Sequence, residues 1–189
     1  HIVYLSAADL ASETSGPMDG VWADVEEVIE RASVTRTFVR GGGFAANTLE
    51  WAEQTRVGDT VRIPFPGAAR SLVDERDLAA VAVRGLVDPE LTGKAVTVTG
   101  PETLTQVEQV QVIGAALGRS LTVEEQPVDE AHREFADVMG EDFAAGALGY
   151  WETLVDHPEP VSEESREVLG RAPHTFAEWA ELHAADFRG

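Results

Sequence analysis

The N-terminal part of the sequence constrains the fold most strongly. Residues 2–5 form a short apolar run, which is typical of a strand covered on both faces. Over residues 18–32, apolar residues recur every three or four positions, which predicts an amphipathic helix. Residues 35–39 are again rich in residues that favour strands. A strand, a helix and a strand of these lengths predict a parallel pair joined by a right-handed crossover, and so an α/β fold.

The helix over residues 18–32 is expected to pack an apolar stripe on the sheet and to turn its acidic residues towards solvent. The apolar residues are Met18, Val21, Trp22, Val25, Val28 and Ile29. The acidic residues expected on or near the solvated side are Asp19, Asp24, Glu26, Glu27 and Glu30.

The rest of the chain continues as α/β and then becomes helical. Helices are expected over 44–54, from Asp74 or Asp77 to about residue 87, and from the capping box of Thr105 and Glu108 to Gly118. Short strands are expected near 61–63, 70–73, 95–99 and 121–125. After residue 127 we expect helices near 129–139, 142–155, 162–169 and 176–187. The predicted organisation is an α/β region over 1–126 and a helical cap on the substrate side over 127–189.

Composition excludes several classes of function. The net charge of −20 would repel nucleic acid and anionic membrane surfaces, so neither is an expected partner. The absence of cysteine excludes disulfides, thiolate metal sites and cysteine nucleophiles. The five histidines do not cluster, so no metal site is expected. The sequence contains neither an apolar run of about 18 residues nor a basic-then-apolar leader, and a cytoplasmic location is therefore expected.

Five segments, taken together and in order, resemble NmrA-like proteins, which are atypical members of the short-chain dehydrogenase/reductase superfamily. They read VYLS, TRTFVRGGGFAANTLEWA, RSLVDERDLAAVA, VTVTGPETLTQVEQVQVIGAALGR and RAPHTFAEWAELHAADF. The resemblance implies the late half of a Rossmann-like NAD(P)-binding domain, with NAD(P)(H) as cofactor. The glycine-rich fingerprint that binds the pyrophosphate in such folds does not occur in these 189 residues.

That missing segment has a structural consequence. In the family it precedes the equivalent of His1, and without it the strand over residues 2–5 would be an exposed apolar edge. We therefore expect, in order of preference, a longer natural chain, a second chain that covers the edge, or a rearranged fold.

The resemblance also implies the positions of the site. It places Ser6 and Ala7 at the carboxyl end of the strand nearest the nicotinamide, and Arg40 and the following glycines in the same crevice. The implied cofactor-binding residues are Ser6, Ala7, Arg40, Gly41, Gly42 and Gly43. A polar strand end would equally explain Ser6, and a turn with positive φ would explain the glycines.

Aromatic residues define the expected substrate pocket. Its residues are Trp22, Phe44, Asn47, Tyr150 and Trp151, with Tyr150 and Trp151 as a lid from the helical cap. Core packing is the alternative explanation for most of these aromatic side chains.

Three functions follow from this reasoning. Typical members of the superfamily use a Tyr-x-x-x-Lys pair, whose equivalents here are Met18 and Trp22, and neither side chain transfers a proton. The first hypothesis is an NAD(P)-dependent oxidoreductase acting on a small, partly apolar carbonyl or quinone-like compound, in which Ser6 or water assists the proton. The second is a non-catalytic dinucleotide sensor or protein-binding regulator. The third is a cofactor-free enzyme that reuses the reductase pocket.

Overall fold

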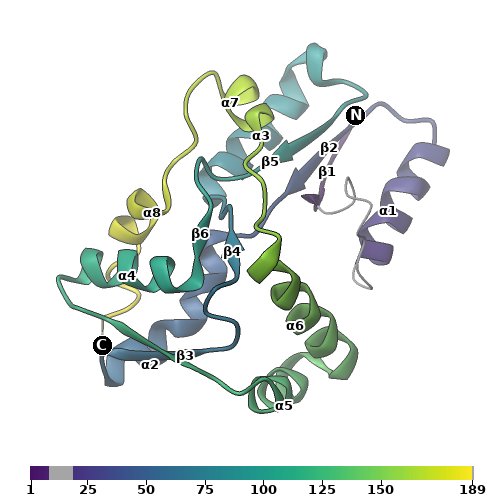
Figure 1. Cartoon of the computed structure of the whole chain (residues 1–189). Helices are drawn as coiled ribbons and strands as arrows, with labels where there is room; N and C mark the ends of the chain where they lie inside the picture. Colours follow the sequence, from purple (N-terminus) through teal and green to yellow (C-terminus); the bar gives the residue numbers. More distant parts are fainter. Residues whose placement is uncertain (9–18, 189) are drawn as a thin grey trace.

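The protein is described by a computed structural model that covers residues 1–8 and 19–188 (Figure 1). Its central sheet contains β1 (Ile2–Ala7), β2 (Arg36–Gly41) and β5 (Ala95–Val98), in the order β1-β2-β5. Both pairs of neighbouring strands are parallel, because Ile2 pairs with Arg36 and Ala7 with Gly41, and β2 pairs with β5 in the same sense. The predicted parallel α/β sheet is therefore confirmed.

Helices cover the two faces of this sheet. On one face lies α1 (Asp19–Arg31), whose Glu26 reaches Arg40 of β2. On the other face lies α3 (Glu75–Val87), where a Cβ on Gly85 would come within 3.2 Å of the Thr37 methyl group. The short helices η3 (Pro89–Leu91) and α7 (Glu163–Leu169) complete this part of the molecule. The core between the sheet and α3 is built from Val39, Val73, Leu78, Val81, Leu91, Val96 and Val98.

A second core lies beside the first sheet (Figure 1). It is framed by the parallel pair β3 (Thr60–Ile63) and β7 (Thr122–Glu125) and by the antiparallel pair β4 (Ala69–Arg70) and β6 (Leu104–Thr105). The surrounding helices are η2 (Ala45–Trp51), α2 (Ala52–Val57), α4 (Gln106–Leu117) and α8 (Phe176–Leu182). The buried residues of this second core include Trp51, Val61, Ile63, Val110, Ile113, Phe176, Trp179 and Phe187.

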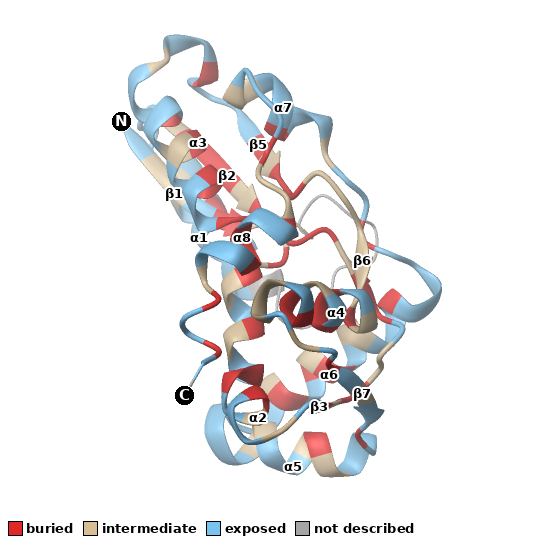
Figure 2. Cartoon of the chain, turned by 90° about the vertical axis from the view of Figure 1, so that its left-hand side faces the viewer, coloured by how far each residue is buried: buried red, intermediate tan, exposed pale blue. Residues whose placement is uncertain are grey.

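The helices α5 (Val128–Met139) and α6 (Glu141–Asp156) form a hairpin beside the second core (Figures 1 and 2), where Glu130 of α5 accepts hydrogen bonds from Arg62 of β3. Phe135 and Trp151 join the two helices edge to face, with ring centroids 5.6 Å apart. The later helices return to the α/β part, since α7 packs on β5 and α8 packs on α4. The boundary at residues 126/127 stays a prediction, and the structure shows that α5 and α6 are the segment that projects.

Several local signals in the sequence correspond to observed structure. Thr105 and Glu108 form a reciprocal capping box, as do Thr175 and Glu178. Gly118 ends α4 in the left-handed conformation, with φ of 69°. Asp74, rather than Asp77, caps α3 by accepting a hydrogen bond from the backbone N–H of Arg76.

Two predicted helices differ from the structure. The segment predicted over 44–54 begins as the 3₁₀-helix η2 and becomes α-helical only at Ala52. The last helix ends at Leu182 instead of residue 187. Leaving the helix there lets the chain bring Phe187 into the second core, where its ring meets that of Trp179 at 6.3 Å.

The orientation of α1 also differs from the prediction. Glu26, which was expected on or near the solvated side, is 6% exposed and points to the sheet, because it pairs with Arg40. Val21 and Val28, which were expected in the buried stripe, are more than half exposed. Met18 lies outside the described residues.

The strand β1 forms one edge of the sheet. Its Ile2 and Leu5 side chains are about two-fifths exposed, as expected for an apolar edge that nothing in the described residues covers. A second chain on this edge stays a prediction. Among the helices of the described part, none is long and apolar enough to cross a membrane.

Candidate functional site

The carboxyl end of the central sheet gathers the residues that were predicted to bind the cofactor. In the β1–β2 register Ser6 lies beside Arg40, and Ala7 lies beside Gly41. Gly41 is in turn paired with Val98 of β5. Open α/β sheets bind ligands in the crevice beyond this end of their strands. The structure therefore brings the predicted residues together, and their role in binding stays a prediction.

Ser6 is distinguished by an unsatisfied hydroxyl group. It is 4% exposed, and its Oγ has no hydrogen-bond partner in the part of the chain that the structure describes. The Glu26 carboxylate is close enough for Ser6 to help lower its pKa, although no hydrogen bond of ordinary geometry joins the two groups. Buried polar atoms are nearly always paired, so an orphaned hydroxyl here is suited to a ligand atom.

Arg40 is held by α1 rather than projecting freely into the crevice. Its Nε and Nη2 donate to the two oxygens of Glu26 at 3.0 and 2.6 Å. Burial tends to raise the pKa of Glu26, but the hydrogen bonds from Arg40 and the positive charge outweigh it and hold that pKa below its usual value. Glu26 is therefore ionised at neutral pH, and the charge of Arg40 is compensated.

The three glycines after β2 allow close packing at this edge. A Cβ on Gly41 would lie 2.9 Å from the Phe44 ring, and one on Gly42 would lie 3.3 Å from the Thr99 methyl group. A Cβ on Gly43 would collide with the guanidinium group of Arg70. None of the three has a positive φ, so the turn explanation offered by the sequence is wrong. Their missing side chains let the Phe44 ring, the Thr99 methyl group and the Arg70 guanidinium group pack directly against this backbone.

The 3₁₀-helix that follows carries two side chains on one face. Residues three apart eclipse one another in a 3₁₀-helix, so Asn47 and Glu50 share a face of η2. Both are exposed. Phe44, the extended N-cap residue, is partly buried and packs its ring against Gly41. The predicted pocket residue Asn47 thus shares a face with a carboxyl group that sequence reasoning missed.

Glu50 has an unusual environment for an exposed carboxyl group. Its surroundings of protein raise its pKa to about 7, and the positive charge of Arg70 and a hydrogen bond with Trp51 offset only part of that effect. Water nevertheless reaches the side chain. Its spacing from Asn47 was the signal available in the sequence.

Arg70 and Tyr150 meet at a buried carboxylate. Arg70 Nε donates to Oε1 of Glu159 at 3.1 Å, and the Tyr150 hydroxyl donates to the same oxygen at 2.6 Å. The other oxygen accepts the backbone N–H of Ser71 at 2.9 Å. The Arg70 guanidinium carbon lies 5.8 Å from the centre of the Tyr150 ring. Glu159 thereby fixes α6 and the segment after it to β4.

The other predicted pocket aromatics lie on separate elements. Trp151 packs on Phe135 within the α5–α6 hairpin. Trp22 lies on α1, is 38% exposed, and packs against Tyr4 at a ring distance of 6.3 Å. The substrate-contacting roles of Trp22, Phe44, Asn47, Tyr150 and Trp151 stay predictions.

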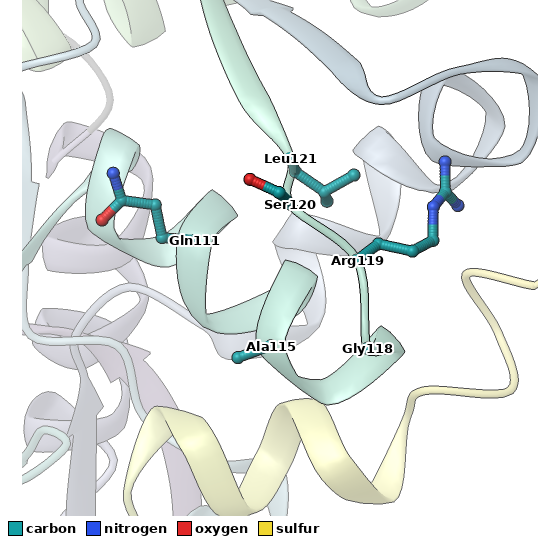
Figure 3. Close-up of a pocket in the computed structure, with 6 residues that line it drawn as sticks. All are labelled: Gln111, Ala115, Gly118, Arg119, Ser120 and Leu121. Carbon is teal, nitrogen blue, oxygen red and sulfur yellow. The ribbon is translucent and has the colours of Figure 1, made fainter.

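Elsewhere in the described residues, neither a metal centre nor a second built site is seen. Within residues 1–8 and 19–188, no three His, Asp or Glu side chains come together as a metal ion would require. A hollow of about 350 Å³ lies at the end of α4, beside Gln111 and Leu121 (Figure 3). Arg119 at its rim is already bound to Asp59 and to the carbonyl oxygens of Thr55 and Gly58.

Two curated proteins are similar to this chain in amino-acid sequence. A (4-alkanoyl-5-oxo-2,5-dihydrofuran-3-yl)methyl phosphate reductase from Streptomyces griseus is 34% identical over 166 residues, which cover 86% of this chain and 58% of the relative. An NAD(P)H azoreductase from Xenophilus azovorans is 30% identical over 171 residues, which cover 89% of this chain and 60% of the relative. The chain thus spans about three-fifths of the length of these relatives. No protein-family model matches it.

Solved structures share the fold at low sequence identity. An NADPH-dependent quinone oxidoreductase from Escherichia coli, solved in complex with NADPH, has a TM-score of 0.80 at 16% identity, covering 96% of this chain and 64% of that protein. NmrA, a negative transcriptional regulator solved in complex with NAD, has a TM-score of 0.65 at 19% identity, covering 95% and 62%. The resemblance predicted from the sequence is therefore confirmed, and the chain has the fold of the NmrA-like NAD(P)-binding proteins, atypical members of the short-chain dehydrogenase/reductase superfamily.

Proposed function

We propose that the protein is an NAD(P)H-dependent reductase of a small, partly apolar acceptor such as a quinone or a reactive carbonyl compound. The observation that carries the proposal is the orphaned hydroxyl of Ser6 beside the side-chain-free segment Gly41–Gly43, at the carboxyl end of a parallel sheet. The names of the relatives support it, since one is a reductase and another an NAD(P)H azoreductase. The quinone oxidoreductase that shares the fold supports the acceptor class.

The residues present fit a nicotinamide nucleotide. Ser6 offers a buried hydroxyl group that has no partner within the described residues, and it lies beside Arg40 at the carboxyl end of the sheet, where open α/β sheets bind ligands. A bound nicotinamide nucleotide would supply a hydride to the acceptor. In this proposal Ser6, Ala7 and the glycines bind and orient, and Arg40 keeps Glu26 and α1 in place.

The charges around the crevice favour a neutral acceptor. Arg40 is compensated by Glu26, and Arg70 by Glu159. An anionic acceptor would have to compete with these carboxylates for its counter-charge. The Phe44 and Tyr150 rings offer apolar surface near Gly41 and Arg70. Trp22, Asn47 and Trp151 belong to the proposed acceptor pocket as well, and Trp151 also joins α6 to α5.

The test is NADPH oxidation by the full-length protein with a panel of acceptors that includes menadione, benzaldehyde and an azo dye. We expect turnover with at least one of them. The Gly42→Val variant should lose NADPH binding, measured by fluorescence titration, because its branched side chain would enter the space beside Thr99. Circular dichroism checks that the variant is folded. NADPH binding without turnover of any acceptor would overturn the proposal.

That outcome would instead support a dinucleotide sensor. The observation that favours this second function is the residue at the position of the superfamily's catalytic lysine, which is Trp22 and packs on Tyr4. The likeness in fold to NmrA, which is described as a negative transcriptional regulator, also supports it. A change in protease protection on adding NAD without acceptor would be its signature.

A further inference from the structure

We infer that Glu26 is a positioning residue for Ser6: held by Arg40, its carboxylate attracts the hydrogen of the Ser6 hydroxyl, so that Ser6 meets a bound nicotinamide nucleotide as a hydrogen-bond acceptor. The inference rests on the proposed function, which it deepens by assigning the direction of one hydrogen bond. Ser6 and Glu26 lie on facing elements, β1 and α1, and both are buried.

The side chain of Ser6 lies on the face of the sheet that α1 covers. Successive side chains of a strand point to opposite faces. Val3 points towards α3, since a Cβ on Gly85 would come within 3.3 Å of its methyl group. The Tyr4 ring instead packs on Trp22 of α1 at 6.3 Å. Ser6, two residues after Tyr4, therefore faces α1.

Arg40 shares this face with Ser6. The two residues are paired in the parallel register of β1 and β2, where neighbouring strands lie about 4.8 Å apart. Tyr4 and Phe38 form an earlier pair in the same register, and their rings meet at 6.3 Å, as side chains on one face do. The Arg40 side chain thus leaves the sheet on the same side as the Ser6 hydroxyl.

Glu26 brings a carboxylate into the space that Ser6 and Arg40 share. Nε and Nη2 of Arg40 donate to its two oxygens at 3.0 and 2.6 Å. Glu26 is one helical turn after Trp22, whose ring packs on β1, and Glu26 and Ser6 are only 6% and 4% exposed. Although burial tends to raise the pKa of Glu26, Arg40 and to a smaller extent Ser6 hold that pKa below its ordinary value. The group is therefore an ionised carboxylate between α1 and the sheet.

An ionised carboxylate beside a buried hydroxyl fixes the direction of that hydroxyl. A serine hydroxyl has one hydrogen and two lone pairs, and it rotates to suit its partners. Because ionised Glu26 can only accept hydrogen bonds, it attracts the Ser6 hydrogen and leaves the lone pairs for another group. A ligand group that meets Ser6 beyond the carboxyl end of β1 should therefore be a hydrogen-bond donor. The nicotinamide ring carries one such donor, the NH2 of its carboxamide group.

A purely structural role is the alternative, because the Glu26–Arg40 pair also ties α1 to the sheet. A second pair of the same kind allows the two roles to be separated. Glu30, one turn further along α1, binds Arg36 of β2 at 2.5 Å and is more exposed. Arg36 is paired in register with Ile2, at the opposite end of β1 from Ser6. Loss of either ion pair loosens α1, but only loss of Glu26 should change the hydrogen bonding of Ser6.

The experiment compares the binding of NADPH with that of reduced 3-acetylpyridine adenine dinucleotide phosphate, in which a methyl group replaces the carboxamide NH2. The Kd values of both nucleotides are measured by isothermal titration calorimetry with the full-length protein and its variants. We expect the unmodified protein to bind NADPH about tenfold more tightly than the analogue, as one hydrogen bond implies. This preference should disappear in Ser6→Ala.

Glu26→Gln tests the positioning role. Its amide group can turn an N–H towards Ser6, which reverses the direction of the hydroxyl, so the preference for NADPH should disappear here too. Glu30→Gln is the matched control and should keep the tenfold preference. Circular dichroism checks folding. If Glu26→Gln does not fold, Glu26→Asp replaces it, because it keeps the charge beside Arg40 and withdraws the carboxylate from Ser6 by one methylene group; the preference should again fall.

The double variant Ser6→Ala/Glu26→Gln distinguishes an effect through Ser6 from an effect on the fold. If Glu26 acts through Ser6, adding Glu26→Gln to Ser6→Ala leaves the ratio of the two Kd values unaltered. If Glu26→Gln changes this ratio by the same factor with and without the Ser6 hydroxyl, the two residues act independently and the positioning role is overturned. A tenfold preference that persists in Ser6→Ala or in Glu26→Gln overturns it as well.

The outcomes also separate this inference from the proposed function. An unmodified protein that binds NADPH without preferring it to the analogue would overturn the inference and leave the reductase proposal standing. An unmodified protein that binds neither nucleotide would overturn the proposed cofactor and, with it, the role of Glu26.

Discussion

Two carboxyl groups, Asp77 and Glu50, lie in environments that differ in burial and in hydrogen bonding. Asp77 is fully buried on α3 and accepts hydrogen bonds from Arg171, from the His174 backbone and from the His174 ring, at 2.6, 2.6 and 2.9 Å. Glu50 is exposed on η2 and has a raised pKa. The first carboxylate holds two segments of chain together by hydrogen bonds, whereas the second is reached by water and has its pKa raised mainly by desolvation.

The region around Asp77 is a structural junction between α3 and the C-terminal segment. Beside it, Trp179 donates its Nε1–H to Glu75 at 2.9 Å, and His183 contacts the other oxygen of Glu75 at 3.0 Å. The rings of Trp179 and His183 stack at 4.5 Å. Polar groups here are paired, so this region contributes stability. In the crevice beyond the central sheet, by contrast, the Ser6 hydroxyl has no hydrogen-bond partner among the described residues.

The largest effect on stability is expected for Trp179→Ala. Trp179 is fully buried, and it stacks on Phe176 at 5.5 Å and on His183. Removing it should lower the free energy of unfolding by about 3–5 kcal/mol, measured by urea denaturation. Trp22→Ala is the control, because Trp22 is 38% exposed and its loss should be much less destabilising. If both variants lost the same free energy of unfolding, the region around Asp77 would not be more important for stability than the region around Trp22.

A smaller loss of stability is expected for Asp77→Ala. The substitution leaves the Arg171 guanidinium group and the part-buried His174 backbone N–H without their acceptor, which should lower the free energy of unfolding by about 1–3 kcal/mol. The comparison variant is Asp137→Ala on the exposed side of α5, which should change it by less than about 0.5 kcal/mol. If Asp77→Ala unfolded like Asp137→Ala, the junction would not depend on its carboxylate.

Glu50→Gln should change the pH dependence of stability. Because the pKa of Glu50 is higher in the folded protein, folding favours its protonated form, and this contribution is lost as pH rises from about 4.5 to about 7. The variant should therefore match the unmodified protein at pH 4 and be more stable at pH 8. After allowance for solvent screening, the gain in the free energy of unfolding at pH 8 is about 1 kcal/mol. Thermal unfolding at the two pH values measures it, and a variant less stable at pH 8 contradicts the argument.

The smallest effect on stability is expected for Ser6→Ala. The substitution removes a buried hydroxyl group that has no hydrogen bond within the described residues, so the free energy of unfolding should change by about 0.5 kcal/mol or less. NADPH affinity should fall instead, by about tenfold if one hydrogen bond to the ligand is lost. Isothermal titration calorimetry and urea denaturation together test this. A large loss of stability with unchanged affinity would place Ser6 among the structural residues.

Local patterns were sufficient to predict much of the fold. The capping boxes at Thr105 and Thr175, the left-handed Gly118 and the parallel β1–β2 pair follow from nearest-neighbour chemistry and from hydrophobic period. The orientation of Glu26 did not follow from local patterns, because helical period cannot foresee that the part-buried Arg40 of β2 will attract a carboxylate inwards. Glu159 also escaped prediction, because its partners Arg70 and Ser71 are 89 and 88 residues away in the sequence.

In the candidate site, too, some properties follow from local sequence and others depend on the tertiary structure. By itself, the sequence determined that the chain is α/β and that Ser6 and the glycines end neighbouring strands, because these properties depend on residue identity and local spacing. Only the tertiary structure decided that the Ser6 hydroxyl has no partner among the described residues, that Arg40 is compensated by Glu26, and that the pKa of Glu50 is raised to about 7. Hydrogen bonding and desolvation depend on groups distant in sequence, and folding alone brings those groups together.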